Sequence, residues 1–110
     1  MDKYGCAMIC TVQDVSDEGD GPDMRLVPLF DAYYEKLKVG VTRLYAAMGA
    51  GHRVDALLRL ENAELPRGGD IDLYAIVEDV QYRIAAAQDD EEDTIITLER
   101  MDKLYEIADS

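Results

Sequence analysis

The sequence has few of the residues on which small enzymes depend. It contains a single histidine, His52, and only two serines, Ser16 and Ser110. A catalytic triad requires a nucleophile beside a base, and neither serine stands in the glycine-flanked turn that exposes such a nucleophile. A Gly-Lys-Ser/Thr phosphate loop is absent, and the Gly-Ala-Gly triplet at 49–51 lacks the third glycine of a dinucleotide fingerprint. We therefore expect a protein that is not an enzyme.

Cysteine is equally scarce. Cys6 and Cys10 are too few for the disulfide framework of a small secreted domain. With His52 they would give a zinc ion at most three ligands from distant positions, and C-x-x-x-C is not a usual zinc spacing. An EF-hand loop beginning at Asp14 would need a glutamate at its twelfth position, where the chain has Arg25. We expect two reduced, buried thiols, no metal ion and no cofactor.

Long apolar runs are also missing. The longest stretch without a charged side chain, residues 4–13, has ten residues, whereas a membrane-spanning helix needs about 18 or more. The three residues before it carry no net side-chain charge, and no small-residue cleavage pattern follows, so the stretch does not resemble a signal peptide. We expect a cytoplasmic protein with no membrane partner.

Basic residues are outnumbered. Eleven Lys and Arg stand against 24 Asp and Glu, giving a formal net charge of -13. A magnitude of about 2 to 8 suffices to keep a small domain in solution, and the excess destabilises the compact state by self-repulsion. The Lys and Arg residues are scattered rather than clustered, so we expect no direct nucleic-acid partner.

A chain of 110 residues, of which 48% are hydrophobic, predicts a single folding unit with a packed core. Residues 1–27 comprise an apolar segment, which could be a short strand or the first turns of a helix, and an acidic, glycine-containing loop. Residues 28–110 carry the remaining apolar patterns. We expect an N-terminal segment attached to a helical domain.

Apolar residues beyond Pro28 recur at helical spacing. The pattern predicts a first helix over 28–48, whose inward face includes Tyr33, and further helices over 52–64 and 70–88. A fourth helix is expected to start at the acidic block, with Asp89 as its cap, and to continue to about residue 108. Asp70 fits the N-cap of the third helix. We therefore expect a mostly α fold of about four helices, in which the last two form an antiparallel hairpin. Because residues 94–98 are β-branched, an α+β fold is the alternative.

Acidic residues concentrate in this expected hairpin. A block of five occupies its turn, and four more fall at i, i+3, i+7 and i+10 on one face of the last helix. At a rise of about 1.5 Å per residue, they would form a negative row about 30 Å long. The expected partner-binding residues are Asp89, Asp90, Glu91, Glu92, Asp93, Glu99, Asp102, Glu106 and Asp109.

Such a row has a charge density similar to that of a nucleic-acid backbone. We expect an acidic interaction or inhibitor protein that docks on a basic, nucleic-acid-binding partner, by analogy of charge alone with anti-CRISPR and anti-restriction inhibitors. The alternative function is a small helical structural or assembly protein that forms a homo-oligomer, such as a homodimer. The row could also be a solvated helix face, or bind divalent cations loosely.

Overall fold

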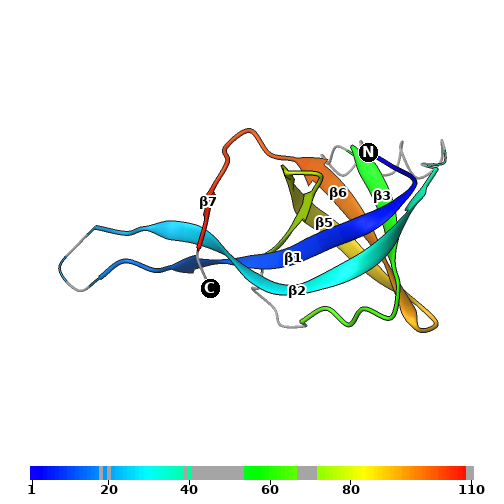
Figure 1. The fold of residues 1–110 in the computed structure, drawn as a ribbon, viewed down its shortest axis with the longest axis horizontal. Coiled ribbons are helices and arrows are strands. Elements are labelled where there is room, and N and C mark those ends of the chain that lie inside the picture. Colours follow the sequence, from blue (N-terminus) through cyan, green and yellow to red (C-terminus); the bar gives the residue numbers. More distant parts are fainter. Residues whose placement is uncertain (18, 20, 39, 41–53, 67–71, 109–110) are drawn as a thin grey trace.

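The chain folds as a β-barrel. The computed structural model describes residues 1–17, 19, 21–38, 40, 54–66 and 72–108, and none of these residues is in an α-helix. Six antiparallel strands close into a barrel, and a seventh, short strand is added outside it (Figure 1). The strands are β1 (Tyr4–Asp14), β2 (Met24–Leu37), β3 (Ala56–Leu60), β4 (Leu73–Val77), β5 (Val80–Asp90), β6 (Asp93–Arg100) and β7 (Glu106–Ile107).

The prediction of a mostly α, four-helix fold is therefore wrong, and so is the α+β alternative. The predicted first helix begins in what is β2, the second contains β3, the third is the β4–β5 hairpin, and the fourth contains β6. The N-terminal segment that could have been strand or helix is β1. The second half of the first predicted helix (41–48), the triplet at 49–51, His52 and Asp70 lie outside the described residues.

The barrel closes because β1 and β2 pair with each other and each also pairs with a second strand. The order is β1-β4-β5-β6-β3-β2, and the β1–β2 ladder returns the sheet to its start. Register irregularities occur between Ile9 and Cys10 in β1 and between Ile84 and Ala86 in β5. Such bulges increase the local bend and twist, which helps a six-stranded sheet to close.

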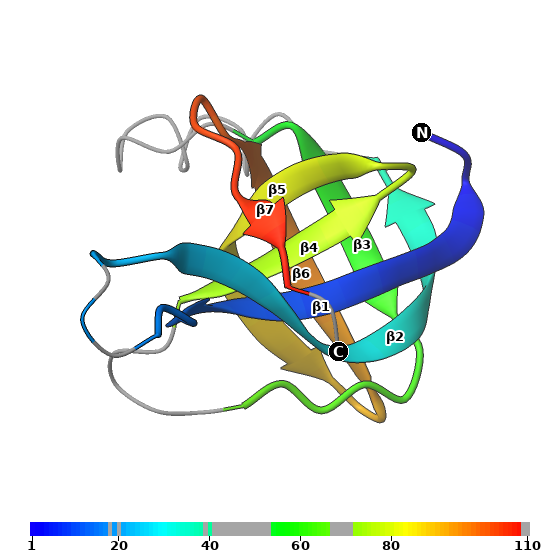
Figure 2. The ribbon, with the colours of Figure 1, turned by 60° about the vertical axis from the view of Figure 1, so that its left-hand side comes forward.

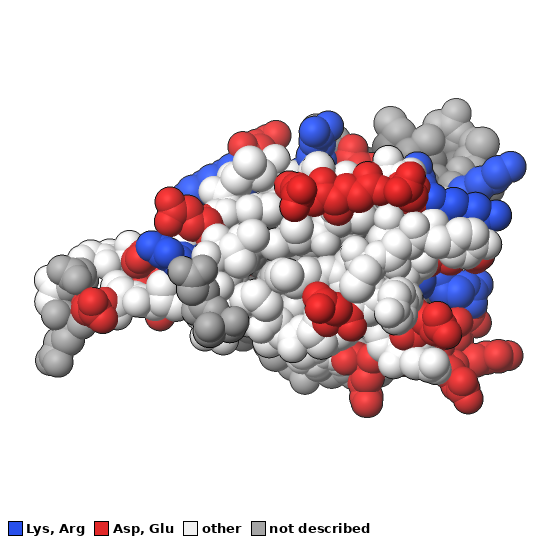
Figure 3. Space-filling view, in the orientation of Figure 1, with Lys and Arg blue, Asp and Glu red and all other residues white. Residues whose placement is uncertain are grey.

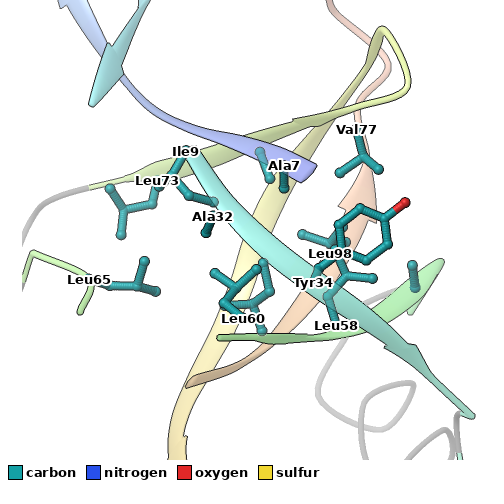
Figure 4. Packing of buried hydrophobic residues seen from close by; sticks show 13 residues of the cluster. Ala7, Ile9, Ala32, Tyr34, Leu58, Leu60, Leu65, Leu73, Val77 and Leu98 are labelled. Carbon is teal, nitrogen blue, oxygen red and sulfur yellow. The ribbon is translucent and has the colours of Figure 1, made fainter. Parts of the chain in front are cut away.

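Side chains fill the interior of the barrel. At every second position of β3 and β6 a large apolar side chain is fully buried, namely Leu58, Leu60, Ile96 and Leu98. Figure 4 shows Leu58, Leu60 and Leu98 inside the barrel. Small residues contributed by β1, β2 and β4 leave room for these larger side chains. Buried side chains in these strands recur every two residues, as in a β-strand, and not every 3.6 residues, as in an α-helix.

Two tight turns join the consecutive strands β4, β5 and β6, one at each end of β5. Val77 pairs with Val80, and the two residues between them, Glu78 and Asp79, have φ values of 52° and 64°. Two successive positive φ angles are the mark of a type I′ turn, whose twist matches that of paired strands. The β5–β6 turn is also two residues long, and the first of them, Glu91, has a φ of 57°.

The β1–β2 hairpin continues beyond the barrel wall. β1 pairs with β4 only at residues 8–11, and β2 pairs with β3 only at residues 34–37. Past these limits the two strands pair with each other and, at two positions of β2, with β7. We call residues 12–26 the arm. Its described residues project from one end of the molecule and contribute to its 49 Å length (Figures 1 and 2).

The segment after β6 lies across the outside of the barrel. We call residues 101–108 the strap (Figure 2). Tyr105 packs edge-on against Tyr74, with ring centroids 5.9 Å apart. The Gln81 side chain fixes the strap, since its Nε2 donates to the Tyr105 carbonyl oxygen at 2.6 Å and its Oε1 accepts from the Tyr105 N–H at 3.0 Å. The strap therefore covers a second apolar cluster that contains Cys10 and Leu26.

Candidate interaction surfaces

The acidic block forms the tip of the β5–β6 hairpin. Asp89 and Asp90 end β5, Glu91 and Glu92 make the turn, and Asp93 begins β6. All five are thus brought together at one end of the barrel, because a two-residue turn leaves the flanking residues directly opposite each other. Figure 3 shows acidic side chains gathered at the end of the molecule where Figure 1 places this turn.

One cation lies inside this group. A guanidinium nitrogen of Arg59, on β3, is 2.5 Å from an oxygen of Asp90 and 3.7 Å from an oxygen of Asp93. The hydrogen bond to Asp90 is the main reason why the pKa of Arg59 is raised above its ordinary value. Asp93 also accepts a hydrogen bond from the Asn62 N–H at 3.1 Å. Asp90 and Asp93 therefore stabilise the hairpin itself, whereas Glu91 and Glu92 are exposed at its tip.

Two more carboxylates extend the group. Glu61 and Glu64 follow β3, and an open groove of about 330 Å³ runs between Glu64 and the β5–β6 tip. We call Glu61, Glu64 and residues 89–93 the acidic end. No group of three metal-ligating side chains there, or elsewhere in the described part of the chain, has the geometry to hold a metal ion. The acidic end can therefore attract a basic surface through its field, which acts without chelation.

Three of the other expected partner-binding residues, Glu99, Asp102 and Glu106, do not join this group. Glu99 lies on β6 with its carboxylate 3.6 Å from the Arg83 guanidinium, and Asp102 is in the exposed bend after β6. Glu106, on β7, is 3.3 Å from Arg25 at the base of the arm. Asp109 lies outside the described residues. The continuous row predicted for a helix face is wrong, since helical spacing does not keep side chains on one face of a strand.

The arm is a second surface, which the sequence reading missed. Its tip closes around Asp14, whose carboxylate accepts hydrogen bonds from the N–H groups of Ser16 and Asp23 at 3.0 and 3.1 Å. These bonds, that from Ser16 first, lower the pKa of Asp14. The acidic, glycine-containing loop was predicted to be solvated, and its described residues form the tip of a projecting hairpin. The missed signal was the apolar, partly β-branched sequence on both sides of this loop.

Exposed apolar side chains accumulate on the same hairpin. Tyr33, predicted to be a core residue, is 72% exposed, whereas its neighbour Tyr34 is buried. Of eight large exposed hydrophobic residues in the described chain, five lie on β1, β2 or their connection. These five are Tyr4, Val15, Met24, Leu29 and Tyr33. Aromatic and methionine side chains at a surface are typical of protein interfaces.

The two thiols differ in environment. Cys10 is buried under the strap, and this burial raises its pKa to about 11. Cys6 is exposed on the outer face of β1, opposite Tyr33, so the expectation that both thiols are buried is wrong for this residue. The two cysteines are free rather than joined by a disulfide.

Comparisons with known proteins do not indicate a function, so the functional argument is based on these surfaces. A scan against protein-family models, a search of curated proteins and a search of solved structures found no match. Within the described residues, no helix has the length and apolar character required to cross a membrane. Function is therefore inferred from what the acidic end and the arm can contact.

Proposed function

We propose that this protein is a structural or assembly protein, whose copies contact one another through the β1–β2 hairpin. The arm is the observation that carries the proposal. A two-stranded hairpin without further strands is at best marginally stable in water, yet this one extends past the barrel and exposes Met24 and Val15 near its tip. Burial of these side chains against another protein surface would stabilise the arm as well as the contact.

The interior of the barrel supports a role in binding rather than catalysis. It is filled by side chains, and the groove between Glu64 and the β5–β6 tip is open to solvent and lined largely by carboxylates. A small-molecule site is typically an enclosed, mostly apolar concavity with a few convergent polar groups. A rigid body with a projecting hairpin is well suited to join neighbouring subunits.

Sedimentation of the purified protein tests this proposal. The wild type should associate as its concentration rises, and Met24→Asp should shift it towards the monomer of 12.3 kDa. Leu104→Asp is the matched control, since Leu104 is an exposed apolar residue on the strap rather than on the arm. Equal association of the wild type and Met24→Asp, with unchanged thermal stability, would reject the proposal.

The acidic end favours a second candidate function, docking on a basic protein that binds nucleic acid. Seven carboxylates with Arg59 among them support it. They form a compact patch instead of a long row, so they match a basic pocket better than a groove shaped for a nucleic-acid strand. An inhibitor of this kind should bind its partner less tightly after Glu91→Lys and Glu92→Lys, with a weaker dependence on salt. Partner binding that is equally reduced by Asp102→Lys would show that only net charge matters.

A further inference from the structure

A groove on the outer face of the barrel connects the acidic end to β1. Tyr4 pairs directly with Glu35 of β2, and Glu35 pairs directly with Arg59 of β3. The residues on either side of Arg59, Leu58 and Leu60, are buried in the barrel, so Arg59 points outward. Directly paired side chains lie on the same face, about 4.5–5.5 Å apart at their Cβ atoms. Tyr4, Glu35 and Arg59 therefore form one row on the outside. They line an open groove of about 340 Å³, which we call the Tyr4 groove.

Carboxylates outnumber cations in the Tyr4 groove. Arg59 is the one cation among its described lining residues, and it already forms ion pairs with the β5–β6 hairpin. Four carboxylates line the groove as well, namely Glu35, Glu61, Glu92 and Asp93. Within the described part of the chain, neither Glu61 nor Glu92 is in an ion pair, and both are exposed. The groove thus has carboxylates available for a cation from outside.

An exposed aromatic ring forms the β1 side of the groove. Tyr4 is 62% exposed, although it lies on a strand of the barrel. The Lys3 ammonium is 5.4 Å from the centroid of this ring, within the distance of about 6 Å at which a cation is attracted to an aromatic face. The chain itself therefore shows an ammonium held by the Tyr4 ring. This contact is independent of the charge of the acidic end, and it points to the same class of ligand.

An adjoining groove provides an internal comparison. The groove between Glu64 and the β5–β6 tip has nearly the same volume, about 330 Å³. It is lined by Glu64, Asp89 and Glu91, together with the two acids of the β5–β6 hairpin that both grooves share. Its described lining residues include neither an aromatic ring nor a cation. Charge alone would therefore favour the adjoining groove, whereas the ring distinguishes the Tyr4 groove.

We propose that the Tyr4 groove binds a lysine-bearing segment of a basic partner protein, with a lysine ammonium between the Tyr4 ring and the Glu35 carboxylate. This inference rests on the second candidate function and names the contact that the partner makes. Lysine fits because its ammonium is a compact charge on a flexible apolar stem, and it would take the place of Lys3 on the ring. The groove crosses four adjacent strands, about 14 Å at about 4.8 Å per spacing. A second lysine, four residues along an extended segment, would therefore reach the carboxylates of the acidic end.

Titration of the full chain with a basic peptide tests this proposal. The probe is the peptide Lys-Gly-Lys-Gly-Lys with both ends capped, and its binding is followed by the amide shifts of isotope-labelled protein. The shifts should centre on the Tyr4 groove. Tyr4→Leu should raise the dissociation constant about two- to fivefold, whereas Tyr4→Phe, which keeps the ring, should leave it unchanged. Glu35→Gln/Glu61→Gln should raise it more than Glu64→Gln/Glu91→Gln, which is an equal charge change in the adjoining groove.

The outcomes separate the Tyr4 groove from the docking function. If the peptide binds but Tyr4→Leu has no effect, or the two double variants lose affinity equally, docking by the acidic end stands and the Tyr4 groove is the wrong site. Shifts of the wild type that centre on the adjoining groove would overturn the proposal in the same way. If the wild type does not bind the peptide, both fail. Melting temperatures equal to that of the wild type would show that a loss of binding is not a loss of folding.

Discussion

The close approach of Gly5 to the Tyr34 ring gives a sharp test of the barrel's structure. A Cβ atom added at Gly5 would lie 2.7 Å from the Tyr34 hydroxyl oxygen and 2.8 and 2.9 Å from two carbons of its ring. The ring is only 4% exposed and belongs to the core cluster, so it has little room to move (Figure 4). Gly5→Ala should therefore force a shift of packed side chains.

The size of this effect follows from two opposing terms. Overpacking a core costs about 1–3 kcal/mol. Gly5 does not have a positive φ, so alanine fits its backbone and returns about 0.4–1 kcal/mol by restricting the unfolded chain. The net loss of unfolding free energy should be about 1–2 kcal/mol, or roughly 4–8 °C in the melting temperature at about 4 °C per kcal/mol.

A double-mutant cycle isolates the contact. Urea unfolding followed by circular dichroism would give the free energies of Gly5→Ala, Tyr34→Leu and the double variant. In the Tyr34→Leu background the ring is gone, so Gly5→Ala should be neutral or slightly stabilising, with a coupling of about 1–3 kcal/mol. If Gly5→Ala were as stable as the wild type, or equally destabilising in both backgrounds, β1 and β2 would not pack as described.

Three further predictions concern the strap, the thiols and the arm tip. Gln81→Ala removes both hydrogen bonds to Tyr105 and should cost about 1–3 kcal/mol, at about 0.5–1.5 kcal/mol each; unchanged urea unfolding would contradict it. Cys6 should react with a thiol reagent at pH 8, whereas Cys10 should stay unreacted until the chain unfolds, since burial raises its pKa to about 11. The folded pKa of Asp14 is lowered, so the order of the tip should persist above the ordinary aspartate pKa and be lost as pH falls through the lowered value. Amide exchange at the arm tip, followed by NMR as the pH is lowered, would measure this loss of order. A tip whose exchange does not depend on pH, or depends on it equally in Asp14→Asn, would argue against the role of the carboxylate.

Some features of the molecule could be read from the sequence because they depend on local composition. The five consecutive acids between two apolar segments predicted a chain reversal, and the chain does turn there between β5 and β6. The acidic, glycine-containing stretch after residue 12 predicted a solvated segment. In both cases the position of the turn follows from residues that cannot enter a core, whatever structure flanks it.

The type of secondary structure could not be fixed in this way. A short apolar run can fit both the two-residue period of a strand and the three- to four-residue spacing of a helix. Tyr33 and Tyr34 are an example. The helical spacing placed Tyr33 inside, but the pairing of β1 with β2 turns Tyr34 inward and leaves Tyr33 exposed. That pairing joins residues up to 31 positions apart, from Tyr4 to Glu35. A single sequence contains no signal for such a register.

The candidate sites depended on the fold in different degrees. The acidic block remained together because its five residues are consecutive. Glu99, Asp102 and Glu106 were grouped with it only by helical spacing, so they separated when the helix proved to be a strand and a strap. The sequence on both sides of the acidic loop carried a signal for a hairpin, but its extension beyond the barrel follows only from the strand pairing.

The contact between copies through the β1–β2 hairpin can be measured most directly by zero-length carbodiimide crosslinking of the wild-type protein. Mixing chains labelled with two nitrogen isotopes identifies contacts between copies, since mixed-isotope peptide pairs arise only between different chains. We predict that mass spectrometry will find Asp14, Asp17 or Asp23 of the arm in such pairs. Crosslinked oligomers whose mixed-isotope pairs never include the arm, or the absence of any crosslinked oligomer, would contradict the account.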